Sequence, residues 1–429
     1  MSSVFVFFQK GVRSKIALIF FLSVSASYGF LADVVNPVVV DVRAASMGNT
    51  ASVTASGSNA IFFNPALLVD AKYLELGAGG RISWGYAEEE APGKEFYTKY
   101  SLVPAFTHVS FTLPIRFEEY AALYPGFGYH EHLDHSYTRA VDWQFGKDSY
   151  TISDTMTGEL GVITGGLALE ILNHYSIGLS YNFGVLSKLK KQYREVIIID
   201  SLNADTSGGF YEEYRIRYRM NASSEASFFQ VGVFAEPFPQ LGISASYRSP
   251  IDWGWRWGEE TISGSLIAWD GSVGWDTFGI QIKREPDDSS AYKLPGIFTF
   301  GIRSKPWPFL TLAGEIQTRL FSGLEILHEK TRLKDASAFK FGVEFNLPVI
   351  LRLGIYSDPI PYADSGQNIA KRITGLTGGI GIPLGQYGEF AASFEYLTWN
   401  QKLSLAEDIY AEHLYRVSTS LKFYFPDAI

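Results

Sequence analysis

The chain has 429 residues, no cysteine and a formal net charge of −9, from 36 Lys and Arg against 45 Asp and Glu. The excess of acid argues against nucleic acid as a partner, because phosphate binding depends on clustered Lys and Arg. The lack of cysteine excludes disulfides, thiol nucleophiles and Cys-ligated metal sites. Charged residues make up only 19% and aromatic residues 15%, a mixture typical of large antiparallel β proteins.

The N-terminus has the order of a secretory signal peptide. Three basic residues precede an apolar run from Ile16 to Val24, and small residues follow it. We predict a signal peptide over residues 1–26, cleaved after Ala26, with Gly29 as the second choice. No later stretch reaches the ~18 apolar residues of a membrane-spanning helix. The chain is therefore expected to be a secreted or periplasmic β protein or an outer-membrane barrel.

Residues 27–72 show no alternation of apolar and polar positions. The stretch from Arg43 to Ala51 is small and helix-compatible, and the residue before Pro65 is expected to be extended. We expect short helices and tight turns here. A segment of this kind before the first strand can be an external periplasmic cap or a plug inside a barrel lumen, and the sequence leaves both open.

From Tyr73 onward, apolar residues fall on alternate positions, as a strand with one apolar face requires. Short links with turn residues alternate with long polar links such as Ser187–Glu212 and Pro250–Ser290, the asymmetry of outer-membrane barrels. We predict an all-β membrane protein, an antiparallel transmembrane β-barrel of about 14 strands over residues 73–429. The alternative is a secreted β-sandwich or repeat-built β protein.

The third predicted strand, Ala121–His130, is interrupted by Pro125, Gly126 and Gly128. Proline removes a backbone donor and glycine weakens strand pairing, so the barrel wall is expected to kink or open there. We interpret these residues as a lateral gate, with an ordinary bulge as the alternative.

Two clusters of histidine or basic residues lie at the end of that strand and beyond it. His130, His132 and His135 resemble a metal-binding cluster, but a polar outer loop is the preferred interpretation, and no metal site is predicted. A basic run at Lys188, Lys190, Lys191 and Arg194 could contact lipopolysaccharide phosphates or simply be solvated.

Two further groups are candidates for ligand capture. They are the tryptophans Trp253, Trp255 and Trp257 and the arginines Arg215, Arg217 and Arg219. The tryptophans could shape an apolar groove in an outer loop or serve loop packing. The arginines, on one strand face lining the lumen or mouth, could pair with a ligand carboxylate or with acidic neighbours. No catalytic motif stands out, so neither an enzyme nor a cofactor is predicted.

Several short stretches, taken in order, resemble the FadL/TodX family of outer-membrane transporters for hydrophobic compounds. They are Arg43-Ala44, Met47-Gly48 and Asn64-Pro65-Ala66 near the N-terminus, and Leu294-Pro295, Pro306-Trp307-Pro308 and Arg352–Pro361 in the last third. The resemblance implies a 14-stranded barrel plugged by an N-terminal hatch over residues 27–72, the first three stretches forming the hatch motif. It also implies lateral release at an inward kink of the third strand. The chain differs from the family in not ending on an aromatic residue, since Pro426–Ile429 follow Phe425.

The function expected from this resemblance is passive transport of hydrophobic compounds, such as long-chain fatty acids, across a Gram-negative outer membrane. The expected partners are those small molecules, outer-membrane lipid and lipopolysaccharide, with the protein a monomer. The alternative is a structural or secretion-accessory barrel of the PorV type that binds partner proteins, because such barrels share the hatch-like opening.

Overall fold

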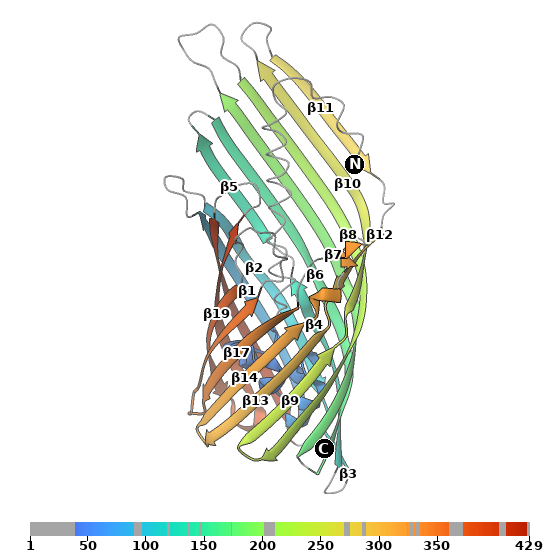
Figure 1. Cartoon of the computed structure of the whole chain (residues 1–429), viewed down its shortest axis with the longest axis vertical. Helices are drawn as coiled ribbons and strands as arrows, with labels where there is room; N and C mark the ends of the chain where they lie inside the picture. Colours follow the sequence, from blue (N-terminus) through green and yellow to red (C-terminus); the bar gives the residue numbers. More distant parts are fainter. Residues whose placement is uncertain are drawn as a thin grey trace.

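β-Strands dominate the chain (Figure 1). The computed structural model describes residues 39–89, 97–117, 121–134, 137–145, 148–172, 174–200, 211–269, 275–284, 289–323, 325–326, 329–330, 335–359, 372–402 and 409–426. The predicted signal peptide, residues 1–26, lies outside the described residues. Among the helices in these stretches, none is long and apolar enough to cross a membrane.

Fourteen of the described strands form one closed antiparallel ring, each hydrogen-bonded to the next. In ring order they are β1 (Leu74–Glu89), β2 (Tyr97–Thr112), β4 (Ala121–Asp134), β6 (Asp148–Ile171), β7 (Tyr175–Asp200), β8 (Tyr211–Phe238), β9 (Leu241–Arg248), β13 (Ile297–Trp307), β14 (Leu310–Arg319), β17 (Ala336–Phe345), β18 (Ile350–Pro359), β19 (Arg372–Pro383), β20 (Gly388–Lys402) and β21 (Ile409–Phe425). The last strand pairs with the first, from Leu74 opposite Phe425 to Glu89 opposite Tyr410, and closes the ring. The predicted 14-stranded barrel is confirmed.

The two faces of the barrel wall differ as the alternation predicts. On β7, the odd-numbered apolar side chains from Tyr175 to Phe183 are 50–56% exposed, whereas Ser176, Ser180 and Asn182 are at most 6% exposed. Tyr, Ile, Leu and Phe therefore form an outer apolar band suited to lipid, and small polar residues face the lumen.

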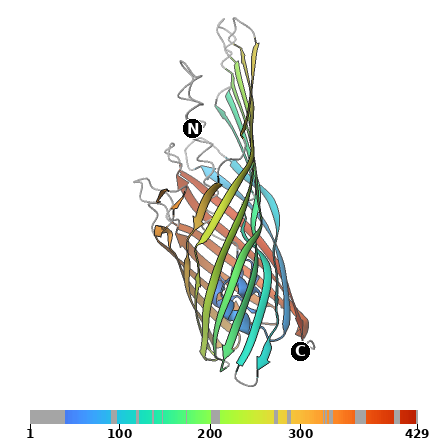
Figure 2. The ribbon, with the colours of Figure 1, turned by 90° about the vertical axis from the view of Figure 1, so that its right-hand side faces the viewer.

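Several predicted outer loops are strands instead. Besides the strands of the ring, the described strands are β3 (Ile115–Phe117), β5 (Tyr137–Phe145), β10 (Ile251–Trp269), β11 (Trp275–Arg284), β12 (Ser289–Leu294), β15 (Glu325–Ile326) and β16 (Glu329–Lys330). Strands β5, β6, β7, β8, β10 and β11 pair side by side beyond the ring and form a sheet that rises on one side of the barrel (Figures 1 and 2). We call this the projecting sheet. The prediction of loops at Ser187–Glu212 and Pro250–Ser290 is wrong for most of both ranges, because cross-strand hydrogen bonds continue past the apolar band whatever the side-chain polarity.

Short helices between residues 39 and 72 lie inside the ring (Figure 1). They are α3 (Val42–Ser46), α4 (Ala51–Thr54), η2 (Gly57–Phe62) and η3 (Pro65–Asp70), and together with their links they are called the inner segment. Asp41 caps α3 by accepting a hydrogen bond from the Ala44 N–H, and Asn64 caps η3, whose first residue is a proline. The helices are short because small and polar residues interrupt every apolar run, and their stability comes from packing against the wall.

Candidate functional site

The residues of the predicted hatch motif fasten the inner segment to the barrel wall. Arg43 makes two hydrogen bonds to Glu344 on β17, from Nε to Oε2 at 2.8 Å and from Nη2 to Oε1 at 2.6 Å. Burial alone would lower the pKa of Arg43, but the carboxylate of Glu344 holds that pKa above its ordinary value. The arginine therefore remains charged and acts as a fixed anchor.

Met47 and Gly48 form the closest approach of the inner segment to the wall. Gly48 has φ of +68°, and a Cβ built on it would lie 2.3 Å from the carbonyl oxygen of Phe341. Its N–H donates to Oγ1 of Thr377 at 2.9 Å. Met47 is fully buried against Val53 and Ala313. Only glycine fits at position 48, because both the backbone conformation and the space exclude a side chain.

The Asn64-Pro65-Ala66 turn contacts the opposite side of the lumen. Nδ2 of Asn64 donates to the Ser52 carbonyl at 3.0 Å, which ties η3 to α4. The Ala66 carbonyl accepts from Oγ of Ser176 on β7 at 2.9 Å. All three positions of this turn are buried, so within the structure the hatch motif has a packing and hydrogen-bonding role.

The predicted gate residues lie on β4 against the inner segment. Pro125, Gly126 and Gly128 pair in register with β6, and the pairing of β4 with β6 is uninterrupted from Ala121 to Glu131. A Cβ on Gly128 would lie 2.7 Å from the ring of Phe62. The glycines therefore admit the inner segment against the wall, and the irregularity of this strand, a bulge between Glu131 and Leu133, comes later than predicted.

Backbone pairing is incomplete on the other side of β4. Its ladder with β2 runs only from Thr112 opposite Gly126 to His108 opposite His130. Among the described residues, β2 has no β4 partner between Ser101 and Thr107, and it next pairs with β5 at Tyr100. The two strands thus separate directly above the His108–His130 pair, and we call this place the β2–β4 split.

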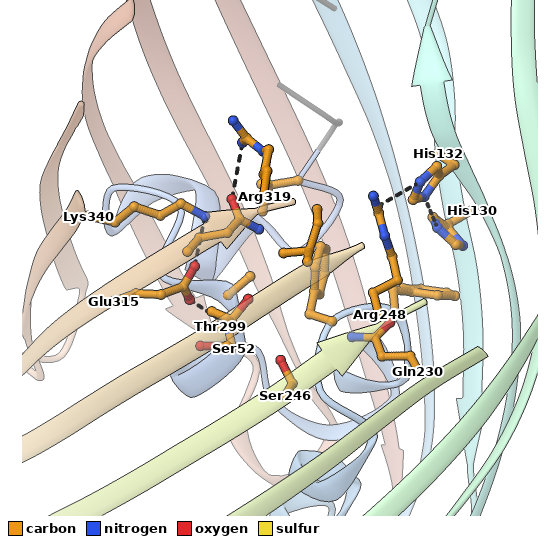
Figure 3. Close-up of a pocket in the computed structure, with 16 residues that line it drawn as sticks. Ser52, His130, His132, Gln230, Ser246, Arg248, Thr299, Glu315, Arg319 and Lys340 are labelled. Carbon is orange, nitrogen blue, oxygen red and sulfur yellow. Dashed lines mark hydrogen bonds and ion pairs between the residues drawn. The ribbon is translucent and has the colours of Figure 1, made fainter. Parts of the chain in front are cut away.

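A cavity of about 70 Å³ lies above the inner segment (Figure 3). Phe62 is among the residues that line it. The polar lining of the cavity comes from the inner segment and six strands: Ser52, His130, His132, Gln230, Ser246, Arg248, Thr299, Glu315, Gln317, Arg319 and Lys340. Phe62 also packs 4.4 Å, centroid to centroid, from His130. The cavity and the β2–β4 split therefore share one boundary, made by Phe62 and His130.

A directed hydrogen-bond chain runs along one wall of the cavity. Arg248 can only donate, and its Nη1 lies 3.0 Å from Nε2 of His132, so this nitrogen accepts. Nδ1 of His132 then carries the proton and donates to Nε2 of His130 at 3.2 Å. Both imidazoles are neutral in this arrangement. These tautomers are inferred from the hydrogen-bond partners of the two rings.

Among the described residues, the charge of Arg248 has no acidic partner. In that part of the chain, no carboxylate lies within ion-pair distance of it, and its Nε has no hydrogen-bond partner. The guanidinium lies 5.7 Å from the centre of the Phe228 ring. A partly buried cation without a counter-charge is unfavourable, so the site is suited to an incoming anion.

The other charged groups of the cavity are neutralised within the protein. Lys340 contacts Oε1 of Glu315 at 2.7 Å, and the other oxygen of this carboxylate accepts from the Ser52 N–H. Arg319 makes a two-point pair with Asp358 on β18. Arg248 is therefore the one cation lining this cavity that lacks a carboxylate in the described part of the chain.

The histidine prediction is wrong in part. His130 and His132 do not belong to an outer loop, because they lie on β4 and are 3% and 7% exposed. Positions two apart on a strand share a face, which brings both to the lumen. His135 lies outside the described residues. Within those residues, no three His, Asp or Glu side chains are grouped so as to hold a metal ion.

The two predicted ligand-capture groups belong to the projecting sheet. Trp253, Trp255 and Trp257 lie on β10, and Arg215, Arg217 and Arg219 lie on β8. Their side chains lie outside the described part of the structure, so their role in ligand capture stays a prediction.

Sequence reasoning missed Arg248. The alternation from Leu241 to Tyr247 places residue 248 on the polar face of its strand, so its lumenal position could have been found. Its lack of an acidic partner could not, because the residues around it come from five other strands.

No protein-family model matches the chain, and no curated protein matches it. Solved structures do. A FadL homologue from Pseudomonas aeruginosa aligns with a TM-score of 0.57 at 11% identity, covering 91% of this chain and 99% of that one. The toluene transporters TodX of Pseudomonas putida and TbuX of Ralstonia pickettii give TM-scores of 0.54 and 0.52 at 11% and 14% identity, each over 90% of this chain and 98% of theirs. The predicted resemblance to the FadL/TodX family is confirmed in the fold.

Proposed function

We propose that the protein is an outer-membrane channel for hydrophobic compounds that carry an anionic head group, such as long-chain fatty acids. The fold is that of transporters named for hydrocarbons, and toluene offers no charge to bind. The observation that carries the proposal is Arg248, a cation directed into the cavity without a carboxylate among the described residues. A fatty-acid carboxylate would supply the missing counter-charge through a charge-assisted hydrogen bond.

The size of the cavity fits a head group and not a whole ligand. Its ~70 Å³ is about half the volume of an engineered cavity that binds one benzene molecule, ~150 Å³. The alkyl chain of a bound acid therefore needs a different apolar surface. Phe62, Phe63 and Ile297 line the same cavity, and we propose that the chain extends past the first two toward the β2–β4 split.

The route out of the lumen is proposed to be lateral. The inner segment lies in the lumen below the cavity and makes buried, hydrogen-bonded contacts with the wall, so a straight path past it is proposed to require that it unfasten. The β2–β4 split lies next to the cavity, and the rings of Phe106 on β2 and Tyr129 on β4 stack beside it, 6.3 Å apart, so a ligand leaving there would have to part this ring pair. A ligand leaving there keeps its alkyl chain in an apolar medium throughout.

The test compares Arg248→Gln with Arg303→Gln. Arg303 is also lumenal, but it pairs with Asp70 at 3.1 Å and therefore serves as a matched control. Binding of oleate and of toluene to each purified, folded variant would be measured by calorimetry. We expect Arg248→Gln to weaken oleate binding at least tenfold, an effect of about 1.4 kcal/mol, while toluene binding and the control variant stay unchanged.

Two outcomes would contradict the proposal. Equal oleate affinity in wild-type protein and Arg248→Gln would show that Arg248 holds no anion. Loss of toluene binding together with oleate would show a general loss of the lumen and not of a head-group site. The purified protein can also be examined for co-extracted molecules, and a co-purified protein in place of a lipid would favour a secretion-accessory barrel.

A further inference from the structure

The charges around the cavity leave a single positive charge over. In the described chain, the Lys, Arg, Asp and Glu side chains that line it are Arg248, Glu315, Arg319 and Lys340. Lys340 is paired with Glu315 at 2.7 Å, and Arg319 is paired with Asp358, so each of these pairs is neutral. Arg248 adds one positive charge that no carboxylate of the described chain balances. The cavity is therefore complementary to one negative charge, provided that its histidines stay neutral.

The hydrogen-bond chain that begins at Arg248 extends beyond the two histidines and fixes their protons. Oγ1 of Thr164 on β6 donates to Oδ1 of Asn182 on β7 at 2.6 Å. Because the hydroxyl proton is used there, the same oxygen accepts from Nδ1 of His130, at 3.5 Å. His130 thus carries its proton on Nδ1 and accepts on Nε2 from His132. Each member of the chain donates to the next, from a guanidinium at one end to an amide at the other.

Neither histidine can add a second positive charge while this chain is intact. A second proton on His132 would occupy Nε2, which faces an N–H of Arg248. A second proton on His130 would occupy Nε2, which faces the N–H of His132. In both cases two donors would meet without an acceptor, which is unfavourable for buried groups. His108 is opposite His130 on β2 but is not among the residues that line the cavity.

A head group with two negative charges would leave one of them unbalanced. Its first charge would pair with Arg248, whereas the second would share a cavity of about 70 Å³ with the carboxylate of Glu315. Moving a charge out of water without a counter-charge costs far more than moving a paired one. A dianion would avoid this cost by taking up a proton as it binds.

We propose that the cavity selects ligands whose head group carries one negative charge, such as carboxylates, sulfonates and phosphodiesters, over dianions such as phosphate monoesters. Arg248 binds the charge. The carboxylates of Glu315 and Asp358, together with the two neutral histidines, limit the site to one charge. The inference rests on the head-group site proposed above and specifies the charge of the ligand that this site accepts.

The test compares two ligands of nearly equal size, dodecyl phosphate and its methyl diester. At about pH 8 the monoester is largely a dianion, because its second pKa is about 6, and the diester carries one charge. Binding of each to the full-length purified protein in a nonionic detergent would be measured by calorimetry. We expect the diester to bind about ten to a hundred times more tightly, the upper limit being the cost of protonating the monoester about two pH units above its pKa. Repeating the titration in buffers of different ionisation enthalpy should show proton uptake with dodecyl phosphate and none with the diester.

Two variants should remove this selectivity by adding a second unpaired cation to the lining of the cavity. Glu315→Gln removes the partner of Lys340, and Asp358→Asn removes the partner of Arg319. In either variant, dodecyl phosphate should bind at least as tightly as the diester. The two carboxylates stand on different strands, β14 and β18, so a folding defect in one variant leaves the other as the test.

Asp70→Asn is the matched control. It removes the partner of Arg303, 3.1 Å away, and Arg303 is not among the residues that line the cavity. This variant also leaves a lumenal arginine unpaired, but outside the cavity, so it should keep the wild-type preference for the diester. Heat-modifiable migration verifies the folding of each variant.

Three outcomes would overturn the inference. They are equal affinity of the wild-type protein for the two ligands, an unchanged preference in the folded cavity variants, and a lost preference in Asp70→Asn. Arg248→Gln separates this inference from the proposed function. If it binds both ligands as tightly as wild type, the head-group site itself is wrong. If it loses both ligands while the wild-type protein binds them equally, only the limit to one charge is wrong.

Discussion

Arg43 and Glu344, 301 positions apart in the chain, meet in a two-point ion pair that fixes the inner segment to the barrel wall. Oε2 of the same glutamate also accepts from Nε of Arg352 on β18, at 2.8 Å. Glu344 is 2% exposed. One buried carboxylate therefore holds two arginines, one from the inner segment and one from the wall.

The shared carboxylate predicts unequal effects of removing either partner. Glu344→Gln leaves two largely buried guanidinium groups without this acceptor and should lower the free energy of unfolding by about 3 kcal/mol. Arg43→Gln should cost less, because Arg352 still pairs with Glu344. Urea unfolding in vesicles measures both, with the exposed Arg372→Gln as control. Equal losses in the two variants would contradict the shared arrangement.

Gly48 and Gly385 form a matched pair for testing the close approach of the inner segment. Their φ angles are +68° and +66°. Gly48→Ala would put its Cβ 2.3 Å from the Phe341 carbonyl, while no heavy atom of the described chain lies within 4 Å of a Cβ on Gly385. Gly385→Ala should cost only the left-handed backbone, about 1 kcal/mol. Gly48→Ala should expose the inner segment to protease, and equal protease resistance in both variants would refute this packing.

Asp41 makes the attachment of the inner segment depend on pH. Its full burial would raise its pKa, but Lys422 and the hydrogen bonds from Ala44 and Asn59 together hold that pKa below the ordinary 3.8. The carboxylate therefore stabilises the fold above that value, and this contribution is lost as the pH falls through the lowered folded pKa. Asp41→Asn should be less stable than wild type at neutral pH, and the difference in unfolding free energy should shrink in acid. A constant difference would argue against Asp41.

The β2–β4 split can be tested with a single thiol, since the chain has no cysteine. Ala105 of β2 lies in the part of that strand without a β4 partner. Ala245 of β9 has paired strands on both sides and is the control. A bulky maleimide on Ala105→Cys should slow oleate uptake by vesicles or cells, and the same label on Ala245→Cys should not. Uptake unaffected by the first label would exclude an exit at the split.

The sequence predicted the barrel because, in a wall one strand thick, odd- and even-numbered positions of a strand face opposite sides. Tyr175 to Val185 shows this most clearly. The turns at Pro237–Gln240 and Leu384–Gly388 could be predicted for the same reason, because they depend on residues close together in the chain. Their turn residues end the pairing of two adjacent strands. Predicting the strand ends on the outer side failed, because β7 and β8 remain hydrogen-bonded far beyond the apolar band and polarity does not reveal where pairing stops.

The sequence by itself thus determined the strand count, the lipid-facing side and the small-residue character of the inner segment, because each depends on residues close together in the chain. Only the tertiary structure decided that Arg248 lacks a carboxylate among the described residues and that β4 leaves β2 above His130. Each of these features depends on residues that are far apart in the chain and that barrel closure and strand register bring together. A buried or clustered charge is stabilised or destabilised by those neighbours, which only the folded barrel brings together.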